Sequence, residues 1–262
     1  MDERTRRILD DRTRAFYLAC ADSFSETRQA PWPGWEPVAR RLAEATQDGN
    51  PVRLLDVGCG NLRFERFLLD RSVGFRALAL DRCEALAVAG LAADPRLSGC
   101  CRIGPFDALR DADVPGGRQA FSAAVAFALL HHIPGHDERM ALLKSMACRL
   151  QEGGLLALSL WDLDSDARLS RKARRDTDRA CRALGLGPLD EGDFVLGWQH
   201  RDDAFRYCHS FSGEEADRIV GQLSGELRLV ERYRSDGPSG CANRYLLFNK
   251  RALSSPSTEQ PL

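Results

Sequence analysis

Two glycines and an acidic residue close a short apolar run in the first quarter of the chain. The run ends at Asp56, and Gly58 and Gly60 follow it directly. Glycine lets the backbone turn sharply and lets a ligand approach with no Cβ in the way. A second acidic residue, Asp81, ends the next apolar run, where a carboxylate can accept hydrogen bonds from both hydroxyls of a ribose. The pattern predicts a site for a nucleotide-type cofactor.

The same reasoning extends this site to the next two apolar runs. Asp107 follows the third run, where a carboxylate can meet the amino group of an adenine. We add its neighbour Ala108, and Phe127 in the fourth run, to the predicted cofactor site. The alternative is a glycine turn that only joins a strand to a helix. The acids at the two further strand ends favour the cofactor.

A regular alternation of strands and helices must position these residues. Predicted strands cover 52–58, 75–81, 99–104, 121–130 and 155–163, with helical patterns over 62–69, 84–91 and 137–150 between them. This order implies parallel βαβ units with right-handed crossovers. Residues 226–233 and 243–251 follow as two strands joined by a turn-rich loop, which predicts antiparallel pairing. We therefore predict an α/β fold with a mostly parallel sheet, helices on both faces and a C-terminal antiparallel strand.

Two kinds of cofactor compete for a glycine turn of this type. A dinucleotide requires G-x-G-x-x-G so that its pyrophosphate sits at the helix N-terminus, and Arg63 stands where the third glycine belongs. The D-x-G-x-G turn with Asp81 and Asp107 instead resembles the class I S-adenosylmethionine methyltransferases, whose cofactor has no pyrophosphate. This resemblance implies a Rossmann-like sheet and S-adenosyl-L-methionine as the cofactor.

Leu62 departs from the glycine-turn pattern, because a third small residue is expected near that position. Its side chain either crowds the methionine end of the cofactor or points into the core. Gly58 and Gly60 keep the turn itself, so we predict weakened or reshaped cofactor binding rather than its loss.

Six short segments closely resemble the methyltransferases that esterify 5-carboxymethyluridine at the tRNA wobble position. This family includes the methyltransferase half of the AlkB-like tRNA-modifying protein, and the resemblance covers roughly residues 12–250. It implies a tRNA partner, and family members often work with a small zinc-binding activator subunit. The family has a third glycine where this chain has Leu62. The matching segments are FSETRQAPWPGW (24–35), DVGCGN (56–61), FALLHHIP (127–134), LSLWDL (158–163), RYCHSF (206–211) and CANRYLLF (241–248).

The implied methyl acceptor is a carboxylate, which is already nucleophilic and requires no strong base. Positioning helps this reaction, as do cations that hold the carboxylate, preferably the forks of arginines. We therefore predict catalytic roles for Arg28, His132, Arg206 and His209. The alternatives are a salt bridge from Arg28 to Glu26 or another acid, and a histidine that only bonds the backbone at a strand end.

Three further residues are candidates for contact with the acceptor. His131 precedes His132 after the fourth predicted strand, at the edge where open α/β sheets bind ligands. Trp32 and Trp161 can stack on a nucleobase, or they can be core aromatics. We assign all three to the substrate site.

Residues 167–184 form a helical pattern with one basic face. At about 100° per residue, six cationic side chains fall on one stripe, while Leu169, Ala173, Ala180 and Leu184 fall on another. A basic stripe can follow a phosphate backbone, and we assign Arg171 and Arg175 to tRNA binding. The alternative is a solvated surface in an arginine-biased protein. The stripe comprises Arg168, Arg171, Lys172, Arg175, Arg179 and Arg182.

Composition restricts the compartment and the partners. The formal net charge of -1 gives no global attraction to nucleic acid or membrane, so a nucleic-acid partner requires a local patch. The nine cysteines are scattered without a C-x-x-C pair, which predicts no zinc site, no bound metal and a reducing compartment. The N-terminus is too charged for a secretory signal, and no apolar run approaches the ~18 residues of a membrane span. We predict a soluble cytoplasmic protein with no membrane partner.

The predicted organisation has five parts. They are an N-terminal helical, substrate-side segment (1–45), a cofactor-binding Rossmann-like core (46–163), a basic helical insertion that caps the substrate (164–210), the completion of the core sheet (211–252) and a disordered tail (253–262). The leading hypothesis is a methyltransferase that acts on a carboxymethyl-type uridine of tRNA. The alternatives are a small-molecule O- or N-methyltransferase, and a catalytically silent module that binds cofactor or RNA.

Overall fold

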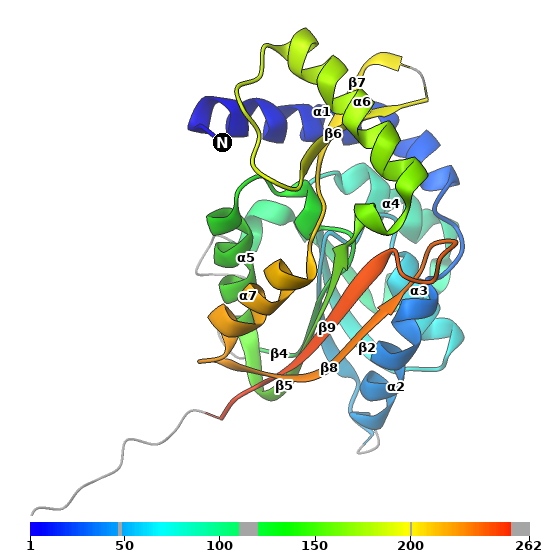
Figure 1. Cartoon of the computed structure of the whole chain (residues 1–262). Helices are drawn as coiled ribbons and strands as arrows, with labels where there is room; N and C mark the ends of the chain where they lie inside the picture. Colours follow the sequence, from blue (N-terminus) through cyan, green and yellow to red (C-terminus); the bar gives the residue numbers. More distant parts are fainter. Residues whose placement is uncertain (47–48, 110–119, 200, 253–262) are drawn as a thin grey trace, which may run out of the picture.

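A seven-stranded sheet forms the centre of the computed structural model, which describes residues 1–46, 49–109, 120–199 and 201–252 (Figure 1). The strands lie in the order β3-β2-β1-β4-β5-β9-β8. β1 to β5 run parallel, and β9 lies antiparallel between β5 and β8. The predicted α/β fold with an antiparallel C-terminal strand is thereby confirmed. The strands are β1 (Val52–Val57), β2 (Phe75–Asp81), β3 (Cys101–Pro105), β4 (Phe121–Ala126), β5 (Leu150–Trp161), β8 (Leu227–Ser235) and β9 (Asn243–Lys250).

Both faces of the sheet are buried beneath helices. Because successive residues of a strand point to opposite faces, β1 sends Leu55 and Val57 into one core cluster and Val52 and Leu54 into the other. Strands buried on both faces read as nearly continuous apolar runs. One face packs on α5 (His136–Arg149) and α7 (Gly213–Leu223), and the other on α2 (Glu36–Glu44), α3 (Arg63–Asp70) and α4 (Glu84–Ala93).

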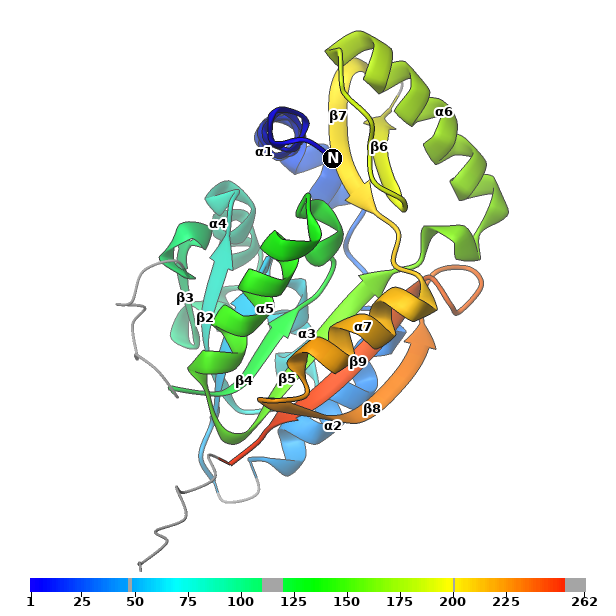
Figure 2. The ribbon, with the colours of Figure 1, turned by 60° about the vertical axis from the view of Figure 1, so that its left-hand side comes forward.

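A cap lies beyond the carboxyl ends of the parallel strands (Figure 2). It consists of the helix α1 (Glu3–Glu26), the hairpin of β6 (Asp193–Trp198) and β7 (Arg201–His209), and the helix α6 (Ala167–Leu184). α1 packs on β7, and α6 packs on β6. The helix expected within 164–210 is present, but the hairpin was not predicted. The described side chains from Ala204 to His209 are all buried, so β7 shows no alternation of polar and apolar residues.

Short 3-10 helices lie in several of the connections between these elements. They are η1 (Pro33–Trp35), η2 (Pro95–Gly99), η3 (Phe106–Leu109), η4 (Leu130–His132) and η5 (Leu163–Ser165). The boundaries of the five predicted parts stay a prediction, and the tail 253–262 lies outside the described residues. Within the described part of the chain, no helix combines the length and the apolar character needed to cross a bilayer.

Leu62 immediately precedes α3 and adopts a left-handed conformation, with φ 57° and ψ 32°. This conformation costs a residue with a Cβ about 1–2 kcal/mol. Its side chain is fully buried in the cluster beneath α2 and α3, and Leu62 is absent from the residues that line the large cavity described below. Of the two alternatives for Leu62, the structure therefore favours a side chain in the core over one that crowds the cofactor.

We expect Leu62→Gly to lower the free energy of unfolding by about 1–3 kcal/mol. Removing a fully buried leucine side chain costs roughly 2–5 kcal/mol, and relief of the left-handed strain returns about 1–2 kcal/mol of this. Denaturant unfolding measures the change. Ser72→Gly is the matched control, because Ser72 has the same conformation, with φ 56°, and is exposed. A gain of stability in Leu62→Gly would contradict the packing role of this side chain.

Candidate active site

One cavity of about 690 Å³ lies where the carboxyl ends of the parallel strands meet the cap. The sheet contributes residues that follow β1, β2, β4 and β5, and the cap contributes residues from α1 and β7. Eleven of the predicted site residues line it, namely Arg28, Trp32, Asp56, Gly58, Gly60, Asp81, Phe127, His131, His132, Trp161 and Arg206. Five do not: Asp107, Ala108, Arg171, Arg175 and His209.

Asp81 organises the glycine turn at the edge of the cavity formed by the ends of β1 and β2. Its carboxylate accepts hydrogen bonds from the amides of Gly60 and Cys83, each at 2.8 Å. Burial raises the pKa of Asp81, although these two amides act in the opposite direction. A carboxylate offers about four acceptor positions, so Asp81 retains capacity for the hydroxyls of a ligand. Gly58 and Gly60 have φ of 81° and 53°, and a Cβ on Gly60 would meet no atom within 4 Å.

Asp56 lines the cavity from the end of β1 but is itself almost completely buried. Glu65, on the first turn of α3, is also fully buried. Burial and the neighbouring Glu65 raise the pKa of Asp56 well above its ordinary value, and burial raises the pKa of Glu65 to about 7. The pair therefore binds a proton more readily than separate carboxyl groups in water.

The turn after β3 contributes a different residue from the predicted ones. Phe106 lines the cavity, and the guanidinium of Arg82 lies 4.8 Å from the centre of its ring. Ala108 packs against the core cluster instead, and Asp107 lies outside the cavity lining. The prediction of Asp107 and Ala108 at the cavity is therefore wrong, because the aromatic residue of this turn lines it instead.

His132 is held by hydrogen bonds at both of its ring nitrogens. Nδ1 lies 2.8 Å from the carbonyl oxygen of Tyr207, which can only accept, so Nδ1 carries the proton. Nε2 then accepts from the hydroxyl of Tyr17 at 2.7 Å. Burial, assisted by the nearby Arg206, lowers the pKa of His132 to about 3. The imidazole is neutral with neither nitrogen free, so in this arrangement His132 orients Tyr17, which also lines the cavity.

His131 differs from His132, because one of its ring nitrogens has no hydrogen bond within the described residues. It is buried, and its Nδ1 has no hydrogen-bond partner among the residues that the structure describes. Burial, followed by the influence of His132, lowers its pKa well below the ordinary value. Its ring lies 5.1 Å from that of Trp161. The cavity wall therefore contains a neutral imidazole whose Nδ1 is buried and unpaired within the described residues.

Arg206 and Arg28 bring positive charge into the same cavity. The Arg206 guanidinium lies 4.9 Å from the ring of Phe16 and 5.3 Å from that of Trp198. Arg206 is 7 % exposed, and its Nη1 has no hydrogen-bond partner in the described part of the chain. Burial and the neighbouring Arg206 lower the pKa of Arg28. No carboxylate among the described residues forms an ion pair with either arginine, including Glu26, the alternative considered for Arg28.

Tyr17, Arg14 and Arg63 are among the cavity residues that were not predicted from the sequence. Tyr17 and Arg14 lie on α1, where the sequence shows only an ordinary charged helix. Arg63 lies 4.9 Å from the rings of both Trp32 and Trp35, and burial lowers its pKa to about 10. The sequence analysis used Arg63 only to exclude a dinucleotide. The contact of Arg63 with Trp32 and Trp35 could not be predicted from the sequence, because it depends on how the chain folds.

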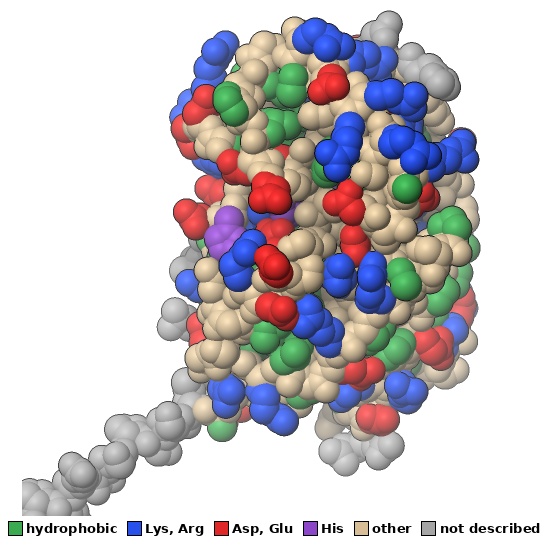
Figure 3. Space-filling view, viewed as in Figure 1, with side chains coloured by type: hydrophobic (Ala, Val, Ile, Leu, Met, Phe, Trp, Pro, Cys, Tyr) green, Lys and Arg blue, Asp and Glu red, His purple; other side chains and the backbone are tan. Residues whose placement is uncertain are grey.

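The remaining two predicted sites lie elsewhere in the cap. His209 ends β7 and is buried in a cluster of charged residues away from the cavity. Arg171 and Arg175 are exposed on α6, where they line a surface groove with Arg168 and Arg174. Figure 3 shows Lys and Arg side chains gathered at the upper right, over the place of α6 in Figure 1.

We expect the ring of His132 to stay neutral throughout the mildly acidic range. An unfolded histidine binds a proton near pH 6.5, whereas His132 in the folded protein has a pKa of about 3. The unfolded state therefore binds more protons between these values, and this residue reduces stability as the pH falls. Nitrogen chemical shifts of the ring, followed by NMR between about pH 7.5 and pH 5, check this. A titration near pH 6.5 would contradict the buried hydrogen-bonded tautomer.

Comparison with known proteins identifies the family. Residues 24–223 match the family model described as "Methyltransferase domain". The tRNA (carboxymethyluridine(34)-5-O)-methyltransferase alkbh8 of Xenopus tropicalis is 27% identical over 157 residues, which are 59% of this chain and 22% of that protein. The tRNA (carboxymethyluridine(34)-5-O)-methyltransferase of Schizosaccharomyces pombe is 24% identical over 148 residues, or 56% of each chain. This chain thus matches about a fifth of the length of the first relative and about half of the second.

Solved structures share the fold at low sequence identity. The 1,6-didemethyltoxoflavin-N1-methyltransferase of Burkholderia thailandensis, solved with S-adenosylhomocysteine, aligns with a TM-score of 0.61 at 16% identity, covering 92% of this chain and 88% of that one. A methyltransferase of Methanosarcina mazei gives a TM-score of 0.58 at 17% identity, covering 78% and 93%. Together with the match over 24–223, the strand order and the glycine turn after β1, these results show that the chain belongs to the methyltransferase-domain family of S-adenosylmethionine-dependent enzymes.

Proposed function

We propose that this protein transfers a methyl group from S-adenosylmethionine to the carboxylate of a carboxymethyl-type modified uridine in tRNA. One observation carries the choice of acceptor: the cavity contains Arg206, which is buried and has an unused donor, beside Arg28. The two guanidinium groups repel each other, and no described carboxylate pairs with them. An anionic acceptor would satisfy both groups at once.

The residues on the other side of the cavity fit the cofactor. Asp81 lines the cavity and retains acceptor capacity for ribose hydroxyls, while Gly58 and Gly60 leave the turn free of side chains. Phe106 and Phe127 supply apolar wall. The Leu62 side chain lies in the core, so the missing third glycine leaves this part of the cavity open.

The proposed reaction requires no proton transfer. Bound S-adenosylmethionine supplies an electrophilic methyl group on a sulfonium. A carboxylate oxygen forms the new bond to the methyl carbon as the carbon–sulfur bond breaks, which leaves a methyl ester and S-adenosylhomocysteine. Arg206 and Arg28 orient the carboxylate. Tyr17 and the free nitrogen of His131 are placed to contact the acceptor, and neither has to act as a base.

A tRNA acceptor is supported by the relatives and by the surface of the cap. The matched proteins from Xenopus tropicalis and Schizosaccharomyces pombe are named as methyltransferases of carboxymethyluridine. The exposed groove of α6 presents Arg168, Arg171 and Arg175 without ion-pair partners among the described residues. Trp32 and Trp161 line the cavity and are only partly buried, so either can stack on a base.

A small carboxylic acid is the second candidate acceptor. This candidate is favoured because α1 and β7 cover the cavity, and a covered cavity suits a small ligand. The two acceptors differ in their dependence on α6, because a small acid has no phosphate backbone for this helix to bind.

We also propose a cytoplasmic location, supported by nine free cysteines. A zinc-binding activator subunit stays a prediction from the resemblance.

Opposite effects are expected from changes on the two sides of the cavity. Arg206→Gln removes a charged hydrogen-bond donor, which is worth about 1.5–3 kcal/mol, and should raise the KM for the acceptor about 10- to 100-fold while the Kd for the cofactor stays within about twofold. Asp81→Ala should instead weaken cofactor binding by about 1–3 kcal/mol and leave the KM for the acceptor within about twofold. Titration calorimetry with the cofactor and initial rates with undermethylated tRNA separate the two. Loss of cofactor binding in Arg206→Gln would contradict this division.

The double charge reversal Arg171→Glu with Arg175→Glu should weaken tRNA binding and flatten its dependence on salt. Each lost phosphate contact lowers the slope of log K against log salt by roughly 0.7–0.9. Arg53→Glu with Arg76→Glu is the matched control, because these exposed arginines are paired in register near the amino ends of β1 and β2. Equal tRNA affinity in both double variants would show that the basic face of α6 does not bind tRNA. It would favour a small acid as the acceptor.

A further inference from the structure

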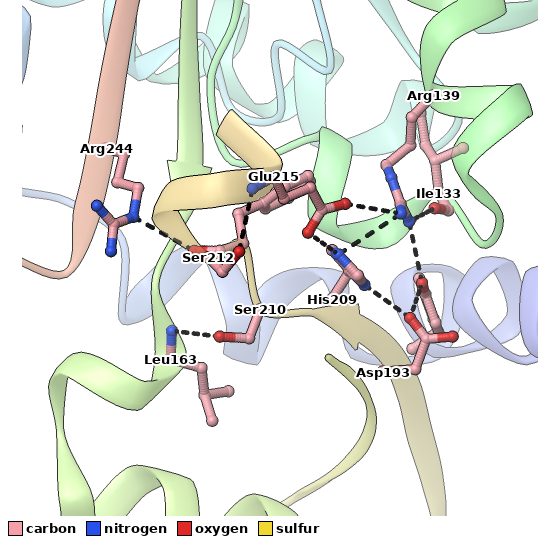
Figure 4. A network of polar contacts seen from close by, with 11 residues as sticks. Ile133, Arg139, Leu163, Asp193, His209, Ser210, Ser212, Glu215 and Arg244 are labelled. Atoms are coloured by element: carbon pink, nitrogen blue, oxygen red, sulfur yellow. Dashed lines mark hydrogen bonds and ion pairs between the residues drawn. The ribbon is translucent and has the colours of Figure 1, made fainter. Parts of the chain in front are cut away.

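Four buried charged or ionisable side chains join the β6–β7 hairpin to the core (Figure 4). They are His209 at the end of β7, Asp193 at the start of β6, Glu215 on α7 and Arg139 on α5, and each is less than 9 % exposed. His209 lies between two carboxylates. Its Nδ1 is 2.7 Å from Oδ1 of Asp193, and its Nε2 is 2.7 Å from Oε2 of Glu215. The cluster thus bridges two strands of the cap and two helices of the core.

This geometry assigns the protonation state of His209. An ionised carboxylate only accepts hydrogen bonds, so both ring nitrogens must donate, and the ring is an imidazolium. Arg139 lies 3.5 Å from Nε2 of His209, but two donors cannot bond each other, and the shorter contact with Glu215 prevails. Arg139 instead donates to Glu215 at 3.3 Å and to the hydroxyl of Tyr207 at 3.2 Å. Two positive and two negative charges then balance inside the protein.

The surroundings of His209 support the charged form. Burial alone would lower its pKa, but the hydrogen bonds with Asp193 and Glu215 outweigh this and raise the pKa above the ordinary 6.5. The positive charge of Arg139 on α5 acts against this rise in the pKa of His209. His131 on η4 also interacts electrostatically with His209. Arg218 on α7 and the N-terminal ammonium act on the two carboxylates rather than on the ring.

The same strand carries the acceptor end of the cavity. Arg206 and Tyr207 directly precede Cys208 and His209 on β7. The carbonyl of Tyr207 accepts from Nδ1 of His132, and its amide donates to Oγ1 of Thr13 on α1 at 2.9 Å. Its hydroxyl donates to Asp193 at 2.5 Å. Tyr207 is therefore bonded both to the charged cluster and to His132, which bonds Tyr17, and it directly follows Arg206 on the strand.

We propose that His209 is a positioning residue: held as an imidazolium between Asp193 and Glu215, it fixes β7 on the core and thereby sets the positions of Arg206 and His132 at the acceptor end of the cavity. The proposal rests on the proposed function for the identity of the acceptor. The cofactor side is built from the ends of β1 and β2, which the cluster does not touch. His209 thus controls acceptor binding and leaves cofactor binding unchanged.

The sign of the pH dependence follows from the raised pKa. Below the unfolded value of 6.5 the imidazolium contributes fully to docking of the hairpin, and this contribution is lost as the pH rises through the folded pKa. A neutral imidazole donates to one carboxylate only and leaves the other buried without its partner. Alkaline conditions should therefore loosen the hairpin, whereas His131 and His132 affect stability at acidic pH.

Hydrogen–deuterium exchange of the amides of β6 and β7 tests the proposal without any acceptor. In His209→Gln we expect faster exchange in this hairpin, unchanged exchange in β1 and β4, at least about a tenfold rise in the KM for undermethylated tRNA, and a cofactor Kd within about twofold of the original protein. His136→Gln is the control, because it removes a partly exposed histidine bonded to Gln222 between the same two helices. Hairpin exchange at the original rate, or an equal loss of cofactor binding, would overturn the proposal.

The unmodified protein provides a second measurement that does not depend on the folding of a variant. Between about pH 6 and pH 9, protection of the hairpin, corrected for intrinsic exchange, should fall relative to that of β1. Parallel protection of the two segments over this range refutes the role of His209. Absence of methyl transfer to tRNA in the unmodified protein would count against the proposed function alone, because the exchange of the hairpin is measured without a substrate.

Discussion

The guanidinium of Arg206 lies among Phe16, Phe24 and Trp198, and one of its nitrogens is unbonded within the described structure. A buried charge without a partner is costly, and unpairing such a charge typically costs about 3–5 kcal/mol. Contacts with aromatic faces return about 0.5–2 kcal/mol each. The protein thus keeps a cation in a largely apolar place at the expense of stability. The proposed anionic acceptor would supply the missing partner of Arg206.

Two separate frameworks meet at the cavity. The ends of β1 and β2 form the side that we propose for the cofactor, where Asp81 accepts hydrogen bonds from the turn. The side that we propose for the acceptor includes β7, which bonds Thr13 of α1 and His132 of η4 through Tyr207. The charged cluster around His209 fixes the other end of that strand. α1 joins the two frameworks, because Ser25 accepts a hydrogen bond from Asn61 and the carbonyl oxygen of Tyr17 accepts one from Cys83.

The sequence predicted the features that follow from local patterns. Gly58, Gly60 and Asp81 lie at the predicted edge, because parallel strands place their carboxyl ends together. Leu62 could not be assigned from sequence, since the choice between core and cavity depends on how α3 packs near Gly90 of α4.

The residues that the sequence analysis missed depend on long-range contacts. Tyr17 reaches the cavity only because α1 packs on β7 beyond the carboxyl ends of the parallel strands, and no periodicity in α1 reveals this. His209 shares a motif with Arg206, yet neighbouring residues of a strand point in different directions, and only Arg206 faces the cavity. In the turn after β3, sequence chemistry favoured Asp107, whereas the fold turns Phe106 toward the cavity.

The central claim is that the cavity presents its two arginines to a carboxylate, so the chemical nature of the product tests it most directly. The protein is incubated with methyl-labelled S-adenosylmethionine and undermethylated total tRNA, and the labelled nucleosides are separated before and after mild alkaline treatment. We expect label on one modified uridine as a methyl ester, which alkali releases as methanol. Label that survives alkali on a ring nitrogen or carbon, or no label in tRNA while a small acid is methylated, would contradict it.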